Sequence, residues 1–207
     1  LSLVPAYKAR DIGFDRALIG AYGHDDRVCS YPAVTALLDN PDTKHTVMVV
    51  LADKEEIGSV GLTGMQSDVL VDIISMISTS LGADPIIVRS NSKCLSADVN
   101  AAYDPNFDDV YEKRNSALIS CGTCLSKYTG SRGKSGTSDA SAEYMGKIRK
   151  MLDEDGVVWQ IGELGKVDAG GGGTVAMYIA NLGVDVVDLG VPVLSMHAPF
   201  ETTSKFD

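Results

Sequence analysis

The feature that most constrains the fold is an alternation of short apolar runs with segments of helical period. The apolar runs are bounded by turn residues, which is typical of buried strands, whereas the other segments repeat their apolar residues every three or four positions. This alternation predicts an α/β sandwich in which helices cover both faces of a mainly parallel sheet. The expected strands are residues 46–51, 85–88, 116–120, 157–161 and 184–189, and the expected helices are residues 31–39, 68–79, 139–152 and 174–182.

The size and composition of the chain fit an ordinary soluble protein. With 207 residues, 44% of them hydrophobic and 22% charged, it can bury one sizeable core. No apolar stretch approaches the roughly 18 to 20 residues that span a bilayer, and residues 1–10 lack the positive start and apolar stretch of a signal peptide. A cytoplasmic protein without membrane association is therefore expected.

The charge balance limits the kind of partner. A net charge of −10 argues against a nucleic-acid surface, because phosphate binding requires clustered Lys and Arg, and the basic residues here are scattered. An acidic chain is instead compatible with metal cations.

The four cysteines are too few and too unevenly placed for a secreted disulfide framework, which favours a reducing compartment. Cys121 and Cys124 form a Cys-x-x-Cys, a spacing found in redox pairs and in zinc knuckles. The sequence has no second pair at knuckle spacing, so buried thiols in a strand are favoured over both alternatives.

Two glycine-rich loops, residues 129–139 and 165–176, each precede an expected helix. Such an entry can bind an anion through backbone amides, but neither loop has a Walker A or Gly-x-Gly-x-x-Gly pattern. A loop that lets a ligand or another backbone approach closely is the favoured interpretation.

A cluster of ionisable residues, Asp53, Lys54, Glu55 and Glu56, follows the expected strand 46–51. In open α/β sheets, ligands bind outside the carboxyl ends of the strands. Two adjacent carboxylates there can have different roles, because one can bind a metal while the other moves a proton. An exposed acidic loop is the simpler alternative for the cluster taken alone.

Other segments supply groups that match this chemistry. GHDDRVCSY contains His24, Asp25 and Asp26 just before an expected helix, CLSADVN contains Asp98, and VPVLSMHAPFE contains His197. A lone His at such a position is more often structural than a ligand. The set of Asp, Glu, Asp and His suits a divalent cation, and a shared Asp can bridge two ions about 3.5 to 4 Å apart.

At these residues the chain resembles a known family. GHDDRVCSY, DKEEIGS, SADVNAAYDPN, KYTGSRGKSGTSDASAE, GKVDAGGGGTVA and VPVLSMHAPFETTSK occur in the order found in the aspartyl aminopeptidase and aminopeptidase I family of dinuclear zinc metallopeptidases. The resemblance covers the whole sequence. It implies a zinc-peptidase-like α/β/α sandwich, a peptide substrate and two divalent metal ions, with zinc the first expectation and manganese or cobalt as alternatives. It also implies a homo-oligomer, a tetrahedral dodecamer built from dimers.

The resemblance assigns roles to individual residues. It makes Asp25 the carboxylate that bridges both metals, Glu55 the general base, Glu56 and His197 ligands of one metal, and Asp98 a ligand of the other. His24 is left out, because the metal-binding His of the family lies in a different, upstream element. Substrate binding is expected at Lys127, Gly170, Gly171, Gly172 and Gly173.

The sequence departs from the family in length. Family members are roughly twice as long, and the expectation is that the upstream part of the peptidase domain, with its metal-binding His, and most of an inserted lid domain lie outside this sequence. Residues 1–23 are expected to return from that lid, and residues 24–207 to form the C-terminal part of the catalytic domain. One metal would then miss a ligand.

Two other functions remain open at this point. A deacylase or a glutamyl-type aminopeptidase could use the same metal architecture with a different substrate. A non-catalytic assembly module could keep the ligand residues and only build an oligomer. The preferred N-terminal residue is also open, because Lys127 or Lys166 could favour an acidic side chain but a solvated Lys is the simpler interpretation.

Overall fold

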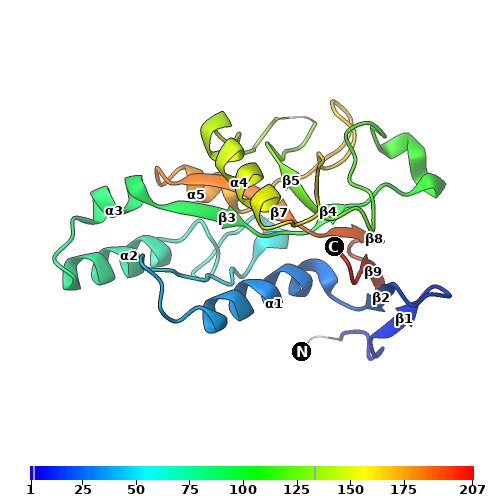
Figure 1. Ribbon diagram of the computed structural model, residues 1–207, viewed down its shortest axis with the longest axis horizontal. Coiled ribbons are helices and arrows are strands. Elements are labelled where there is room, and N and C mark those ends of the chain that lie inside the picture. The colour runs from blue at the N-terminus through cyan, green and yellow to red at the C-terminus, as the bar shows by residue number, and fades with distance from the viewer. Residues whose placement is uncertain (2, 133) are drawn as a thin grey trace.

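The computed structural model describes residues 1, 3–132 and 134–207, whose strands form two mixed sheets (Figure 1). The strand order is β1-β2-β9-β8-β4 in the five-stranded sheet and β3-β7-β5-β6 in the four-stranded sheet. The strands are β1 (Arg10–Ile12), β2 (Leu18–Ala21), β3 (Lys93–Ser96), β4 (Asn100–Ala101), β5 (Thr123–Ser126), β6 (Trp159–Ile161), β7 (Asp185–Gly190), β8 (Pro192–Leu194) and β9 (Glu201–Ser204).

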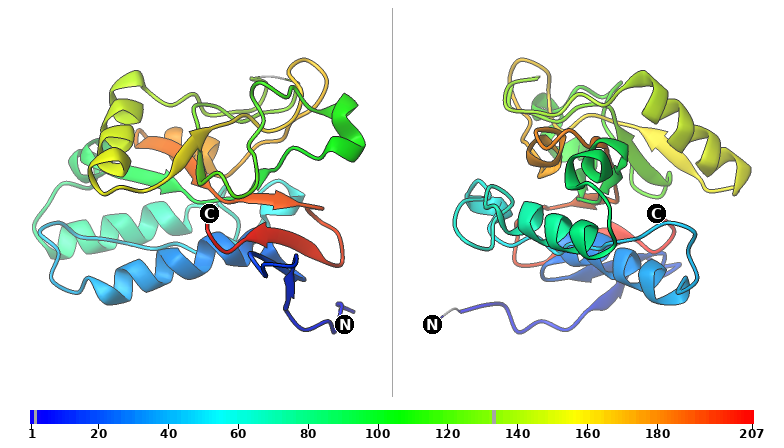
Figure 2. Two further views of the ribbon diagram at one scale, coloured as in Figure 1. Left: turned by 45° about the vertical axis from the view of Figure 1, so that its right-hand side comes forward. Right: turned by 90° about the vertical axis from the view of Figure 1, so that its left-hand side faces the viewer.

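The helices surround these sheets, with α4 on one side of the four-stranded sheet and α1 and α2 on the opposite side (Figures 1 and 2). The elements are α1 (His24–Asp39), α2 (Val69–Ser80), α3 (Pro85–Asn91), α4 (Ala142–Glu154) and α5 (Ala176–Ala180), with 3-10 helices η1 (Glu55–Ile57) and η2 (Pro105–Val110). Within the described residues no single helix is long and apolar enough to cross a membrane, although α2 and α3 meet that criterion together as a pair bent by 112°.

The core of the four-stranded sheet follows from the alternation of side chains along β7. Val187 lies in a cluster with Leu125 of β5 and with Tyr144 and Ile148 of α4, while the preceding Val186 packs with α5 on the other face. The spacing of Tyr144 and Ile148 places them on one face of α4. Helices therefore cover both faces of this sheet, as expected from the sequence.

The predicted mainly parallel sheet is wrong in the described part of the chain. Three strand pairs are parallel (β3–β7, β4–β8 and β5–β6), and four are antiparallel (β1–β2, β2–β9, β5–β7 and β8–β9). The β1–β2 and β8–β9 pairs are joined by short connections, which allow antiparallel neighbours without a crossover helix. Only Val191 separates β7 from β8, so one continuous segment links the two sheets.

Three of the predicted strands are not strands. Residues 85–88 form the first turn of α3, because Asp84 Oδ1 accepts a hydrogen bond from Ile86 N (2.8 Å) and Pro85 occupies the start of the helix. In residues 116–120 only Ala117 makes a bridge, to Ala102. Residues 46–51 lie outside any strand, and an apolar run becomes a strand only where a neighbouring strand takes its hydrogen bonds.

The remaining predictions agree with the structure within a few residues. The expected strands 157–161 and 184–189 are β6 and β7, and the helices 68–79 and 139–152 are α2 and α4. Residues 31–39 form the second part of α1, and residues 174–182 contain the shorter α5. Residues 1–23 contribute β1 and β2 to the five-stranded sheet; their assignment to a lid, and the two-part domain division, stay predictions.

Candidate metal centre

Asp25 and Asp26 lie in the first turn of α1, where the chain turns out of β2. Gly23 takes a left-handed conformation there (φ 73°), which glycine adopts without steric cost. Asp25 N donates a hydrogen bond to Glu201 Oε2 (2.9 Å), and the Asp25 side chain is only 11% exposed. The neighbouring His24 is buried, and its Nε2 lies 3.2 Å from Ile19 O. The structure therefore places Asp25 at the site and gives His24 a structural contact.

Glu55 and Glu56 lie at the start of η1, a single tight turn. Lys54 precedes it in a left-handed conformation (φ 66°), and the turn is closed by Ser59 N donating to Lys54 O (2.7 Å). Non-glycine residues in this region are strained and persist where the surroundings fix them. The acidic cluster of the sequence is therefore a defined turn with two adjacent carboxylates rather than a shapeless loop.

His197 lies in the connection between β8 and β9, also in a left-handed conformation (φ 65°). Its backbone N donates to Glu201 Oε1 (2.7 Å), so Glu201 accepts hydrogen bonds from the backbones of both Asp25 and His197. The imidazole is largely exposed and turned toward η1 and α1, since its Nε2 lies 2.8 Å from Asp25 Oδ2 and 3.1 Å from Glu56 Oε1.

These side chains form two clusters that share one carboxylate. Ligand atoms of Asp25, Glu56 and His197 lie within 4.8 Å of one another, and so do those of Asp25, Asp26 and Asp98. Asp98 enters the second cluster from the segment after β3, where its backbone O would lie 1.5 Å from a Cβ on residue 190. Glycine at position 190 is therefore required for this close approach. Asp25 thus stands where a bridging ligand would stand.

The electrostatics of the site are those of crowded carboxylates. Burial, reinforced by the charges of Asp25 and Asp26, raises the pKa of Asp98 to about 8. Burial also raises the pKa of Asp26 to about 7, with Asp25 adding to the effect. Burial raises the pKa of both Asp25 and Glu55, and the negative charge of the neighbouring Glu56 raises it further. Such an arrangement opposes ionisation of the whole set unless a cation neutralises it.

The donor set fits a divalent metal. It combines several carboxylates with one imidazole, the ligand types that zinc accepts. Within the described residues, Asp26 Oδ1 is buried without a hydrogen-bond partner, although Cys29 and Ser30 lie near the rest of that carboxylate. A buried carboxylate oxygen in this state is available to a cation.

The comparison with known families decides the identity. The profile of the aminopeptidase I zinc metalloprotease family (M18) matches residues 1–207. This chain belongs to the M18 family. The resemblance seen in the sequence is therefore confirmed.

Several M18 relatives are close to this chain in sequence and structure. A probable M18 family aminopeptidase 1 of Clostridium acetobutylicum is 50% identical over 211 residues, a match that covers 100% of this chain and 45% of the relative. The crystal structure of the Thermotoga maritima M18 aminopeptidase has a TM-score of 0.94 and 45% identity, and covers 99% of this chain and 46% of that one. The mApe1 dodecamer of Saccharomyces cerevisiae has a TM-score of 0.81 and 27% identity, and covers 97% and 45%. The chain spans less than half the length of these relatives.

The predicted substrate-binding residues do not lie next to the predicted metal ligands. Glu55 lines the same cavity as the two clusters, whereas Lys127 and the glycines at 170–173 do not. Lys127 follows β5, forms an ion pair with Asp139 and donates to Ala140 O (2.9 Å). The glycine loop packs by backbone against Gly130, Arg132 and Gly136, and a Cβ on residue 171 would lie 2.3 Å from Gly130 O. Close backbone packing therefore requires glycine at position 171.

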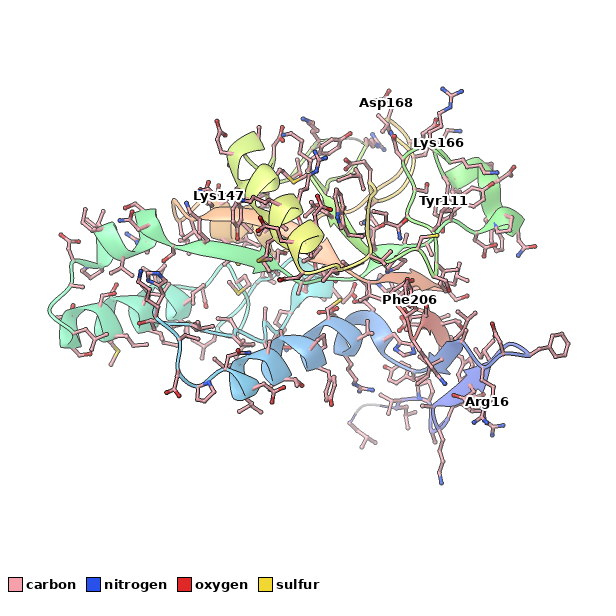
Figure 3. All side chains as sticks on the ribbon, in the orientation of Figure 1. Arg16, Tyr111, Lys147, Lys166, Asp168 and Phe206 are labelled. Atoms are coloured by element: carbon pink, nitrogen blue, oxygen red, sulfur yellow. The ribbon has the colours of Figure 1, made fainter. Side chains whose placement is uncertain are left out.

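Lys166 also lies away from the clusters. It stands with Asp168 on the loop at the outer edge of the molecule (Figure 3), and its Nζ donates to Asp109 O (3.2 Å). The cysteines of the Cys-x-x-Cys differ from each other, because Cys124 is buried in β5 and Cys121 is exposed.

Two residues of the site were given no role from the sequence. Asp26 directly follows Asp25 and belongs to the second cluster. Its position next to a candidate ligand was the only available signal. Glu201 is buried beside the backbones of Asp25 and His197, and a single Glu four residues after His197 carries no pattern that predicts burial.

Proposed function

We propose that this chain carries the metal centre of a zinc aminopeptidase that releases N-terminal residues from peptides. One observation carries the proposal: the two clusters of potential ligands share the carboxylate of Asp25. Membership of the M18 family supports it, as does the name of the relative from Clostridium acetobutylicum. The roles of the individual residues are taken from the resemblance of the sequence motifs to this family.

The proposed centre holds two divalent ions. Asp25, Glu56 and His197 hold one, and Asp25 and Asp98 hold the other, with Asp26 beside them. Zinc is the metal that the family implies, and manganese or cobalt suits the same ligand types. When bound, zinc acts as a Lewis acid that lowers the pKa of water and polarises a peptide carbonyl.

Glu55 is the proposed general base. Its carboxyl group belongs to neither cluster but lines the same cavity. Burial and the neighbouring Glu56 and Asp25 raise its pKa, which brings it closer to the range in which a base works near neutral pH. Glu55 takes a proton from the attacking water and passes it to the departing amine.

The wider properties of the protein are part of the same proposal. Lys127 and the loop of Gly170, Gly171, Gly172 and Gly173 contribute to substrate binding, and the protein acts in the cytoplasm as a homo-oligomer. The yeast relative that was solved as a dodecamer supports oligomerisation. Residues 24–207 would form part of the catalytic domain, with residues 1–23 returning from a lid.

The test compares substrates and one variant in the protein that contains this chain. Leucyl and aspartyl p-nitroanilides are assayed with free and with acetylated N-termini. The expected result is cleavage of the free substrates only, and a decrease in kcat of about 100-fold or more for Glu55→Gln, with zinc content unchanged. The matched control is Glu143→Gln on the exposed side of α4, which should keep full turnover.

Two outcomes would contradict the proposal. Equal release of p-nitroaniline from the acetylated substrates would show that no free amine is needed, and release of acetate from them would favour a deacylase of the same architecture. Unchanged turnover of the Glu55→Gln variant would remove Glu55 from the mechanism.

A further inference from the structure

Glu201, the first residue of β9, is a buried carboxylate that belongs to neither cluster of potential ligands. It is 2% exposed, and its oxygens are not among the ligand atoms of the two clusters. Within the described residues no Lys, Arg or His side chain forms an ion pair with it. A buried carboxylate is costly unless hydrogen bonds replace those that it made to water. The burial of Glu201 therefore depends on the hydrogen bonds that its oxygens accept.

The five-stranded sheet places Glu201 between two segments that carry potential ligands. β9 lies between β2 and β8 (Figure 1), and Glu201 pairs with Ala21, the last residue of β2. After β2 the chain enters the first turn of α1, which contains Asp25. On the other side, the connection from β8 to β9 contains His197. Both segments therefore pass next to Glu201.

The side chain of Glu201 lies on the face of this sheet that α1 covers. Val193 of β8 lies directly opposite Thr203 of β9, and Val193 packs with Cys29 of α1. Opposite residues of a strand pair share a face, and so do residues two positions apart along one strand. Because Glu201 is two positions before Thr203, its carboxylate is directed toward the side of α1.

Both oxygens of Glu201 accept hydrogen bonds from the backbone of a potential ligand. Oε2 accepts from Asp25 N (2.9 Å), and Oε1 accepts from His197 N (2.7 Å). Hydrogen bonds to a carboxylate are roughly twice as strong as those between neutral groups. Since Asp25 belongs to α1 and His197 to the β8–β9 connection, one side chain fixes two separate segments of backbone relative to each other.

The position of the His197 imidazole depends more on its backbone than on packing. The side chain is 59% exposed, so few neighbours hold it in place. The backbone is left-handed at His197 (φ 65°) and at Ser195 (φ 58°), a conformation that non-glycine residues keep only where the surroundings impose it. The hydrogen bond from His197 N to Glu201 is such a constraint. With the backbone held in this way, His197 Nε2 lies 2.8 Å from Asp25 Oδ2 and 3.1 Å from Glu56 Oε1.

We infer that Glu201 is a positioning residue, which holds the backbones of Asp25 and His197 so that both side chains can reach one metal ion. This inference rests on the metal centre proposed above. Asp25 belongs to both clusters, whereas His197 belongs to one. Loss of the hydrogen bond from Asp25 should therefore weaken the binding of both ions, and loss of the one from His197 should weaken the binding of one ion.

Two variants remove different properties of this side chain. Glu201→Gln keeps its length but replaces one acceptor oxygen by an amide NH2 group, which can only donate. One of the two backbone N–H groups then faces a donor and loses its hydrogen bond. Glu201→Asp keeps both acceptor oxygens but removes one methylene group, so that the carboxylate no longer reaches both N–H groups. The matched control is Asp188→Asn, which alters a buried carboxylate of β7 that does not line the cavity of the two clusters.

The readout is metal affinity rather than activity, measured in the protein that contains this chain. Zinc affinity is obtained by competition with a chromophoric chelator, and cobalt binding is followed by visible absorption. Glu201→Gln and Glu201→Asp should each lower the affinity for at least one zinc ion about 10- to 100-fold, as loss of groups that orient metal ligands does at other sites. Both should also change the cobalt spectrum, because this spectrum depends on the arrangement of the ligands.

A purely structural role of Glu201 predicts a different result. The loss of a buried hydrogen bond would then lower the free energy of unfolding but leave the zinc affinity of the folded protein unchanged. Urea denaturation of the metal-free protein measures this free energy separately. Asp188→Asn should show this second pattern, with altered stability and unaltered zinc affinity.

The outcomes separate the positioning role from the proposed function. If the unaltered protein binds no zinc, the proposed metal centre fails, and the positioning role fails with it. If the unaltered protein binds zinc and folded Glu201→Gln protein binds it equally well with the same cobalt spectrum, only the positioning role fails. An equal loss of zinc affinity in Asp188→Asn would also refute it, because the effect would then not be specific to Glu201.

The Glu201→Asp variant decides the question if the Glu201→Gln protein does not fold. A loss of zinc affinity of about 10-fold or more in folded Glu201→Asp protein supports the positioning role. Undiminished zinc affinity there would refute it.

Discussion

Two regions of the molecule differ in how completely their apolar side chains are buried. One is the four-stranded sheet with α4, and the other is the segment from residue 46 to residue 91. In the first region Leu125 is 0% exposed and contacts a cluster built from β5, β7 and α4. In the second, Leu51 is 61% exposed and its segment makes no strand. Both regions carry strong apolar patterns. The difference shows that a pattern predicts which face will be buried, but the burial itself depends on the partner available.

The largest expected effect lies in the packed region. Leu125→Ala removes a fully buried side chain and leaves a cavity, so it should lower the free energy of unfolding by about 2–5 kcal/mol. Urea denaturation followed by circular dichroism measures this. A loss below about 1 kcal/mol would mean that the core around β5 is not tightly packed.

The next effect is a pH dependence that arises in the same region. Burial raises the pKa of Asp188 from 3.8 to about 6, while Thr174 Oγ1 donates to its Oδ1 (2.7 Å); Cys94 and Glu163 are the nearby titratable groups. The folded chain therefore binds more protons than the unfolded chain between about pH 4 and 6, and stability falls as the pH rises through this window.

Asp188→Asn should remove this contribution, which is at most about 3 kcal/mol. Unfolding free energies at pH 4 and pH 7 are compared for both proteins, and the variant should lose less stability between them. An identical pH dependence in both proteins would contradict the assignment to Asp188.

A smaller effect comes from a matched pair of helix caps. Ser141 caps α4 by accepting from Tyr144 N (3.2 Å), and Asp84 caps α3 by accepting from Ile86 N (2.8 Å). Ser141→Ala should cost about 1 kcal/mol of global stability, whereas Asp84→Ala should mainly increase local hydrogen exchange in α3. Equal losses in the free energy of global unfolding would show that α3 and α4 unfold as one unit, which would contradict the distinction between the two regions.

The smallest effect is expected in the unpaired segment. Leu51→Ala in the chain alone should change the free energy of unfolding by less than about 0.5 kcal/mol, because the side chain is already largely exposed. A cost comparable to that of Leu125→Ala would mean that residues 46–51 are packed in solution.

The same contrast explains how much of the fold the sequence could predict. The helical period of 68–79 and 139–152 identified α2 and α4, and the apolar run before Gly190 identified β7. β1, β2, β8 and β9 are only three or four residues long, too short for a periodic signal. Residues 46–51 have the composition of a strand. A strand forms only where a neighbouring strand takes its backbone hydrogen bonds, and the composition of a segment does not reveal whether it has such a neighbour.

The candidate site divides in a similar way. Asp25, Glu56, Asp98 and His197 were expected to meet because of the motifs that resemble the M18 family, and the structure brings their side chains into two adjoining clusters. The role of Glu201 could not be read from the sequence. Glu201 contacts Asp25, which lies 176 positions earlier in the chain, and His197, which lies four positions earlier. Only folding brings these three residues together.

The proposed dinuclear centre is tested most directly by counting zinc per chain with elemental mass spectrometry after dialysis against trace zinc. Because Asp25 belongs to both clusters and His197 to one, we expect about two zinc ions in the unaltered chain, about one after His197→Ala and none after Asp25→Ala. One ion or none in the unaltered chain, or equal losses in the two variants, would contradict a centre in which Asp25 is shared.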